Sequence, residues 1–219
     1  LMKSETLYIA YGSNLNLPQM AFRCPTAEVV GASEIKDYEL LFSVRLAAQC
    51  TDARVNLVTP ALFARYPTLE DFARADVDEV GTYVQSCGFW RAKARDIVSS
   101  AQQLLERFGG RVPDTMDDLL SLPGVGRKTA NLILGDVYGK DGYVCDTHCI
   151  RITGRLGITD GSKDPLKVER QLRAALPPEE ATDFCHRMVL HGRTLCMARK
   201  PECDRCPLRP LCDYGTAAE

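Results

Sequence analysis

The 219-residue sequence lacks the features of a membrane protein and of a strongly basic nucleic-acid-binding protein. It has no apolar run approaching the roughly 18 residues that a membrane-spanning helix needs, which excludes such a span. Its 27 Lys and Arg residues are outnumbered by 29 Asp and Glu residues, giving a formal net charge of -2. Overall charge therefore gives no electrostatic case for nucleic acid, so any DNA-binding surface must be local.

The opening residues, LMKSETLYIAYGSN, also lack the long apolar core of a secretory signal peptide. We therefore expect a cytoplasmic protein in a reducing compartment. There, a metal site explains the ten cysteines better than disulfides do. With 45% hydrophobic residues, the chain can bury a core in one or two domains.

Apolar residues recur at three- and four-residue spacing from about Ile35 onward, which predicts a helical chain. The longest uninterrupted helix is predicted over residues 90–108, with Gly109 as its C-terminal stop. A helix beginning at Asp52 contains Pro60, which should kink it.

A glycine-containing turn lies at the centre of the stretch from Leu122 to Asp146, LPGVGRKTANLILGDVYGKDGYVCD. One apolar helical run ends just before the turn and a second one begins just after it. Gly124 and Gly126 allow positive φ and remove side chains, so backbone N–H groups can closely approach an anion. The N-terminus of the second helix favours phosphate as well, and Lys128 lies in its first turn.

Three interpretations compete for this turn. It could be only a helix-helix connection with solvated Arg127 and Lys128. It could be the end of a nucleotide-binding P-loop, but that motif requires glycines where this sequence has Leu122 and Arg127. The third interpretation is a DNA-binding helix-hairpin-helix.

Asp146 follows a short extended segment and occupies the expected N-cap of a helix over residues 147–156. Its carboxylate could serve only as a cap, which is the commonest reason for Asp at such a position. A pinned carboxylate would also be a good electrostatic partner for a reacting cation. His148 could contact phosphate or pack locally.

Four cysteines near the C-terminus are separated by six, two and five residues. Thiolates in such a compact set suit either tetrahedral zinc or an iron-sulfur cluster, and their number does not decide between the two. The surrounding segment is locally basic, which points to phosphate binding or to a solvated face. The four residues are Cys196, Cys203, Cys206 and Cys212.

The run Leu-Pro-Gly-Val-Gly-Arg-Lys-Thr-Ala, the Cys-Asp-Thr-His segment, the His-Gly-Arg triplet and the cysteine spacing together resemble the endonuclease III family. The resemblance extends roughly from Tyr38 to Tyr214. It implies an all-α fold with a six-helix domain containing the helix-hairpin-helix, residues 35–140, and an iron-sulfur cluster domain, residues 141–219. Residues 1–34 form an atypical N-terminal segment.

The same resemblance implies a base-excision-repair DNA glycosylase with AP lyase activity, acting on oxidised pyrimidines or abasic sites in duplex DNA. The enzyme would be monomeric, cytoplasmic and nucleoid-associated. Lys128 would attack the sugar, Asp146 would stabilise the positive charge that develops there, and the four cysteines would hold a [4Fe-4S] cluster. The implied or expected DNA contacts are Gln49, Phe89, Gly124, Val125, Gly126, Arg127, His148, Arg193, Arg199 and Lys200.

Gln49 and Phe89 have specific roles under this resemblance. Gln49, within Leu-Ala-Ala-Gln-Cys-Thr-Asp, would fill the space left by an extruded nucleotide. Phe89, within Gly-Phe-Trp, would be an apolar wedge. Taken alone, the two segments are better explained by a surface glutamine at a helix end and an aromatic pair in the core.

The N-terminal segment carries a different resemblance. Residues 7–42, with Tyr-Gly-Ser-Asn after the β-like run Thr6–Tyr11, are similar to the start of a gamma-glutamylcyclotransferase-like domain. No segment matches the part of that family that bears its catalytic glutamate, so we infer no cyclotransferase activity. A gene fusion, a recombined start or an assembly artefact would explain this opening.

Three alternatives to the glycosylase/lyase remain at this point. An adenine-type glycosylase relative would share the hairpin and the cysteines, but usually has no lysine at position 128 and carries a further C-terminal domain. A non-catalytic iron-sulfur DNA-binding protein would need neither Lys128 nor Asp146. A hybrid chain could fail to form an active enzyme.

Overall fold

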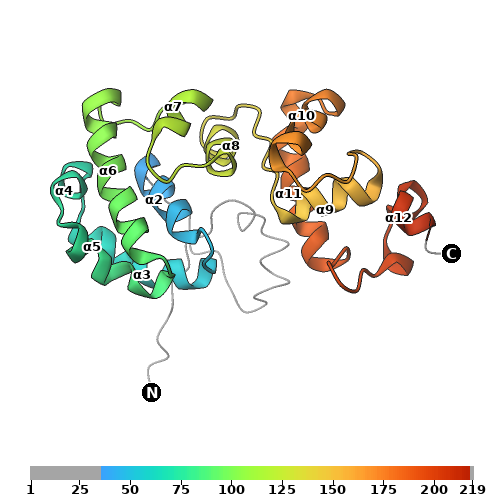
Figure 1. Ribbon diagram of the computed structural model, residues 1–219, viewed down its shortest axis with the longest axis horizontal. Coiled ribbons are helices and arrows are strands. Elements are labelled where there is room, and N and C mark those ends of the chain that lie inside the picture. Colours follow the sequence, from blue (N-terminus) through green and yellow to red (C-terminus); the bar gives the residue numbers. More distant parts are fainter. Residues whose placement is uncertain (1–35, 218–219) are drawn as a thin grey trace, which may run out of the picture. The chain divides into compact units, whose positions relative to one another are not determined.

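The computed structural model describes residues 36–217, and regular secondary structure in this part is helical throughout, as Figure 1 shows. The predicted all-α fold is therefore confirmed. The β-like run and most of the cyclotransferase-like stretch lie outside the described residues. No helix in the described part is long and apolar enough to cross a membrane.

The described chain forms two compact units, residues 36–130 and 131–217. Helix α8 (Arg127–Asp136) begins in the first unit and ends in the second. The domain limits expected from the sequence remain predictions. The first unit also contains α2 (Asp37–Ala47), α3 (Asp52–Arg65), α4 (Leu69–Arg74), α5 (Val77–Val84), η2 (Gln85–Cys87), α6 (Trp90–Phe108) and α7 (Met116–Ser121).

Helix α6 is the central element of the first unit and packs against α2, α4 and α5 (Figure 1). It spans the predicted residues and stops at Gly109, whose φ of 59° is the left-handed conformation that glycine adopts without strain. A cluster of aromatic rings adds to the core between α2, α3, α4 and α5; it comprises Tyr38, Phe42, Phe63, Tyr66, Phe72 and Tyr83.

The short helices of this unit begin at side-chain caps. Thr68 and Asp71 form a complete capping box at α4, and Thr115 caps α7. Helix α3 continues through Pro60 as a single element. Caps of this kind replace backbone partners that the first turn of a helix lacks, which lets elements of six residues form.

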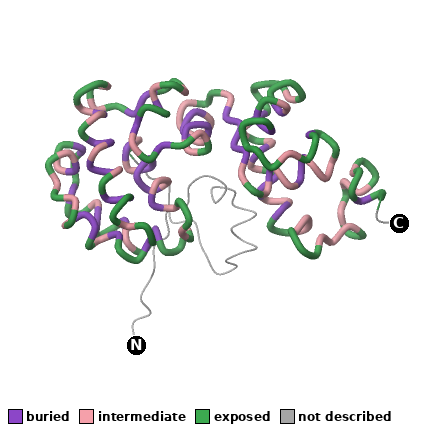
Figure 2. The backbone as a smooth tube through the Cα atoms, in the orientation of Figure 1, coloured by how far each residue is buried: buried purple, intermediate pink, exposed green. Residues whose placement is uncertain are grey.

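The second unit is built around α9 (Thr147–Leu156) and α11 (Ala181–Thr194), which pack together. Its core includes Tyr143, Ile152, Leu172 and Met188, and Figure 2 marks the buried positions along the chain. The remaining elements are α10 (Pro165–Ala175), η3 (Pro178–Glu180), η4 (Cys203–Arg205), η5 (Arg209–Leu211) and α12 (Asp213–Thr216).

The cysteines outside the C-terminal set lack its spacing and behave as small core residues. Cys87, Cys145, Cys149 and Cys185 are buried and Cys50 is half-buried, all as free thiols. Cys24 lies outside the described residues.

Candidate functional site

The hairpin between α7 and α8 contains a tight turn closed by a hydrogen bond of 3.2 Å from Val125 N–H to Leu122 O. Pro123 and Gly124 are its central residues, and Gly124 has a φ of 73°. Proline followed by a residue with positive φ is the pattern of a type II turn. Ser100 on α6 donates a 2.9 Å hydrogen bond to Pro123 O and so fixes the turn to the helix behind it.

The two hairpin glycines have different roles. A Cβ atom on Gly124 would lie 2.4 Å from Arg45 Nε and 2.5 Å from Asp96 Oδ2, so only glycine fits. Gly126 does not use the positive φ that glycine allows, and a Cβ atom there would meet nothing within 4 Å. The backbone at Gly126 is thus open to a ligand, whereas Gly124 is required by packing.

Helix α8 starts directly after the hairpin, where Ala130 N–H donates a 2.9 Å hydrogen bond to Gly126 O. Lys128 is exposed in its first turn. Val125 is only 8% exposed, so its side chain belongs to the core and only its backbone can face a ligand. Arg127 is half-buried and is engaged with other residues.

Asp146 is the N-cap of α9, as predicted. Its Oδ1 atom accepts hydrogen bonds from the backbone N–H groups of His148 at 2.9 Å and Cys149 at 2.8 Å. Its Oδ2 atom accepts no hydrogen bond from the described residues. The half-buried carboxylate is therefore held through one oxygen and presents the other.

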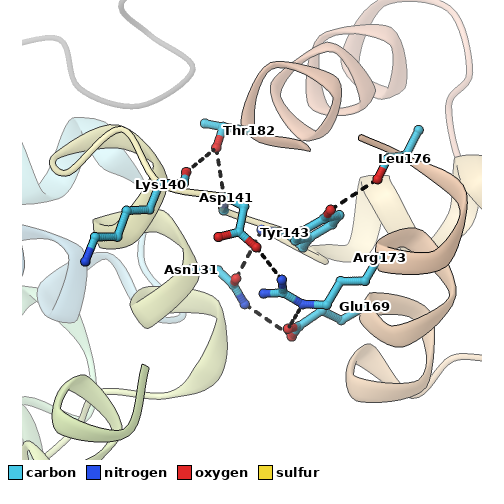
Figure 3. A network of polar contacts seen from close by, with 9 residues as sticks. Asn131, Lys140, Asp141, Tyr143, Glu169, Arg173, Leu176 and Thr182 are labelled. Atoms are coloured by element: carbon cyan, nitrogen blue, oxygen red, sulfur yellow. Dashed lines mark hydrogen bonds and ion pairs between the residues drawn. The ribbon is translucent and has the colours of Figure 1, made fainter. Parts of the chain in front are cut away.

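A buried polar network in the second unit positions the segment that leads to Asp146. Figure 3 shows Asn131, on α8, between Tyr143 and Glu169. Its Oδ1 atom accepts a 3.0 Å hydrogen bond from Tyr143 N–H, and its Nδ2 atom donates one of 3.2 Å to Glu169. On the other side, Gly142 N–H donates a 3.1 Å hydrogen bond to the Thr182 hydroxyl.

Arg173 completes this network from α10. It pairs with Asp141 and donates a 3.1 Å hydrogen bond to Glu169, while its guanidinium lies 4.3 Å from the centre of the Tyr143 ring (Figure 3). Tyr143 OH in turn reaches Leu176 O at 3.3 Å. We did not identify these residues from the sequence, where an asparagine inside the apolar run of α8 was the only signal.

His148 packs locally. A Cβ atom on Gly192 of α11 would lie 2.4 Å from His148 Nδ1, and Arg151 Nη2 is 3.1 Å from the same nitrogen. Burial lowers the pKa of His148. A neutral ring that accepts from Arg151 at Nδ1 carries its proton on Nε2, which remains a donor.

Gln49 and Phe89 share an uncommon backbone conformation. They are the only non-glycine residues with positive φ in the described part of the chain, at 55° and 46°. Both are exposed, and Phe89, which the core interpretation would have buried, is 71% exposed. Backbone strain of this kind persists where the surroundings enforce it, and it is concentrated at functional sites.

The four C-terminal cysteines line one pocket, together with Arg155, His191 and Tyr214. Arg155 Nη1 lies 3.2 Å from Cys196 Sγ, and His191 Nε2 lies 3.5 Å from Cys206 Sγ. Within residues 36–217, no three His, Cys, Asp or Glu side chains are placed to hold a single metal ion. A ring of thiols around a pocket, rather than around one point, suits a cluster in which each thiolate binds a different iron.

The basic side chains around the cysteines fall into two groups. Arg205 and Arg209 pair with Glu202 and Asp204, at 2.5 Å and 2.6 Å. The other three are exposed and form no ion pair within the described part of the chain; they are Arg193, Arg199 and Lys200. These three therefore remain available to an external anion.

Comparison with known proteins identifies the family. The model of the HhH-GPD superfamily of base excision DNA repair proteins matches residues 42–178, and that of the iron-sulfur binding domain of endonuclease III matches residues 196–212. Endonuclease III of Synechocystis sp. is 43% identical over 193 residues, covering 86% of this chain and 88% of that protein. The chain belongs to the endonuclease III family. The Escherichia coli K12 member is 38% identical over 190 residues, covering 87% and 88% of the two chains.

Solved structures of endonuclease III bound to DNA have the same fold. One is a trapped covalent intermediate and another a non-covalent complex, each with a TM-score of 0.78, 39% identity and coverage of 92% of this chain and 94% of that one. A thermostable thymine-DNA glycosylase, at 23% identity and a TM-score of 0.73, shares the fold. The chain is thus an enzyme of base excision repair, a DNA glycosylase and AP lyase with a [4Fe-4S] cluster.

Proposed function

We propose that this endonuclease III relative removes oxidised pyrimidines from duplex DNA and cleaves abasic sites, with Lys128 as nucleophile and Asp146 as its partner carboxylate. The proposal rests on the exposure of the Lys128 side chain and on the hydrogen bonding of the Asp146 carboxylate. Lys128 is exposed at the open start of α8, and Asp146 is pinned through one oxygen with the other available. Both belong to sequence segments that match the family.

Lys128 and Asp146 have different roles in the reaction. A target base inside the stack is out of reach, so its nucleotide must first be flipped out. The neutral amine of Lys128 attacks C1′ of the sugar, the N-glycosidic bond breaks, and the base leaves with the bonding electrons and a proton. The sugar ring then opens: the C1′–O4′ bond breaks, O4′ takes a proton, and C1′ and the lysine nitrogen form a Schiff base. The Schiff base withdraws electrons, so C2′ loses a proton and the 3′ phosphate leaves with the C3′–O bonding electrons. Asp146 stabilises positive charge on the sugar during attack and assists the proton transfers.

The remaining site residues bind DNA or the iron-sulfur cluster. The open backbone at Gly126 and the N-terminus of α8 would hold a phosphate, with Arg193, Arg199 and Lys200 adding salt-dependent contacts elsewhere on the duplex. Gln49 and Phe89 would enter the stack around the extruded nucleotide. Cys196, Cys203, Cys206 and Cys212 would hold the cluster, which fixes the basic loop. The enzyme would act as a cytoplasmic, nucleoid-associated monomer.

Borohydride trapping tests the mechanism. The purified enzyme, incubated with abasic-site DNA and then reduced, should give a covalent adduct that Lys128→Ala abolishes. Lys163→Ala, which removes another exposed lysine, should trap normally. An adduct that persists in Lys128→Ala would refute the assignment of the nucleophile. The absence of an adduct with the wild type would favour a non-catalytic DNA-binding protein or a hybrid chain without activity.

Substrate choice needs a second assay. Duplexes that differ only in the lesion, carrying a ring-saturated thymine or a mispaired adenine, should be cleaved in the first case and left intact in the second. Excision of the adenine would favour the adenine-type relative instead.

A further inference from the structure

Lys93, in the first turn of α6, is completely buried, with 0% of its surface exposed. A fully buried lysine is rare unless its ammonium group is paired. Its Nζ atom donates two hydrogen bonds, to Leu46 O at 2.8 Å and to Cys87 O at 2.7 Å. Both acceptors are backbone carbonyls, and they come from segments 41 residues apart in the sequence.

The two carbonyls lie at the bases of the two loops with strained backbones. Leu46 precedes Gln49 by three residues and Cys87 precedes Phe89 by two. The backbone N–H of Lys93 also donates a 3.1 Å hydrogen bond to Phe89 O. One residue therefore holds the Phe89 loop at two points and the Gln49 loop at one.

Among residues 36–217, no carboxylate contributes to this arrangement. The charged or titratable groups facing the ammonium are the thiols of Cys50 and Cys87 and the guanidinium of Arg45. Burial lowers the pKa of Lys93, because it removes water that would solvate the charge. A lone buried ammonium is a costly way to stabilise a fold, but charge-assisted hydrogen bonds to two carbonyls fix their positions well.

We propose that Lys93 is a positioning residue that holds the Gln49 and Phe89 loops in fixed register, so that both side chains enter the duplex together when a nucleotide is extruded. This inference rests on the proposed insertion of Gln49 and Phe89. Free loops would have to find their inserted conformations separately, whereas loops tied to one amine are already ordered. Pre-ordering reduces the entropy lost on binding.

The test uses Lys93→Met, which matches the apolar part of the lysine side chain and removes its donors. The readout is the fluorescence of 2-aminopurine placed opposite an abasic site, which rises when the base loses its stacking partners. We expect the rate of this rise to fall by roughly 10–100-fold, as a small misplacement of inserting groups costs about that much. Thermal unfolding should stay cooperative, since methionine suits a buried site. Lys93→Arg, which keeps a charge and donors, should retain most of the wild-type rate.

A triple variant, compared with the double variant of the two loops, separates positioning from a general structural role. If Lys93 acts through the two loops, then Lys93→Met combined with both Gln49→Ala and Phe89→Ala should be no slower than the loop variants without it. Additive losses, or an unchanged rate in Lys93→Met, would overturn the inference. A folded Lys93→Arg variant as slow as Lys93→Met would also overturn it. If Lys93→Met does not fold, Lys93→Gln, which shortens the side chain and removes its charge, replaces it with the same expectations.

The outcome also distinguishes this inference from the proposed function. If Gln49→Ala and Phe89→Ala leave the fluorescence change intact, insertion itself is wrong and Lys93 has nothing to position. If those two variants slow the rise and Lys93→Met does not, only the role of Lys93 is wrong. Borohydride trapping by Lys93→Met on pre-extruded, single-stranded abasic DNA should remain normal, because Lys128 is untouched.

Discussion

Arg45 donates two hydrogen bonds to a single carboxylate oxygen of Asp96, at 2.7 Å from Nε and 2.5 Å from Nη2. The pair joins α2 to α6 and is only about one-fifth exposed, at 18% and 21% for the two side chains. It lies directly against Gly124, where a Cβ atom would overlap both partners. The hairpin therefore rests on an ion pair that leaves room for glycine alone.

Replacing Gly124 with alanine should destabilise the protein and weaken DNA binding. Alanine would be strained by the positive φ at this position, and its Cβ atom would displace the Arg45–Asp96 pair. We expect the free energy of unfolding to fall by about 1–3 kcal/mol, the usual cost of such strain. Denaturant titration followed by helical circular dichroism measures this change.

Gly126→Ala is the matched control, because its Cβ would enter open space and its φ is not positive. Its stability should stay within about 0.5 kcal/mol of the wild type, as is usual for open surface positions. If its backbone contacts phosphate, affinity for abasic-site DNA should nevertheless decrease. Equal destabilisation by both substitutions would contradict the different roles of the two glycines.

Asn131→Leu should disrupt the segment before Asp146. It removes the acceptor for the buried Tyr143 N–H and a donor to Glu169. Each unsatisfied buried group costs about 1–3 kcal/mol, so we expect a total loss of about 2–4 kcal/mol in chemical denaturation. Asn131→Asp keeps the acceptor but faces the Glu169 carboxylate, so its deficit should shrink as the pH falls. A deficit independent of pH would argue against that contact.

The sequence predicted helix ends and caps well, because these depend on residues that are neighbours in the chain. The stop of α6 at Gly109 and the capping role of Asp146 each depend on neighbours within a single turn. The cysteine spacing likewise predicted residues that line one pocket.

Features that depend on distant residues were not visible in the sequence. The Lys93–Leu46, Arg45–Asp96 and Asn131–Glu169 contacts join residues 38 to 51 positions apart. The spacing of residues along a helix predicts contacts only between positions a few residues apart, and none of these contacts lies within a single recognisable motif. The sequence likewise does not show which hairpin glycine takes the positive φ that both allow; Gly124 does, and that alone closes the turn.

His186 should make stability dependent on pH. Its Nε2 atom lies 2.7 Å from Asp136 Oδ1, and this hydrogen bond raises the pKa of His186 in the folded protein. The stabilisation is then fully present below the unfolded-state pKa of about 6.5, and it is lost as the pH rises through the higher folded-state value.

Comparison with His186→Gln isolates this contribution. Burial lowers the pKa of His148 and of His191, so these two histidines make the protein less stable at low pH. Because the wild type and His186→Gln share this effect, it cancels in the comparison. The difference in unfolding free energy between wild type and variant should be largest near pH 5.5 and smallest near pH 9, on either side of the histidine range. A difference that grows with pH would contradict the assignment.

Loss of the cluster should be visible when one of its proposed ligands is replaced. Cys206→Ala removes a thiolate from the pocket, so the broad visible absorbance of an iron-sulfur protein should weaken or disappear. Cys50→Ala, at a half-buried cysteine outside the set, should keep the full absorbance. A colourless wild-type protein that contains zinc would rule out the cluster.

The unpaired basic residues around the four cysteines should set part of the salt dependence of DNA binding. Each phosphate contact contributes about 0.9 to the slope of log affinity against log salt concentration. Replacing Arg193, Arg199 and Lys200 together with glutamine should therefore reduce the slope by up to about 2.7. Arg205→Gln, also beside these cysteines but paired with Glu202 at 2.5 Å, should change it much less. An equal reduction per residue for Arg205 would mean that overall charge, rather than availability of these three side chains, determines binding.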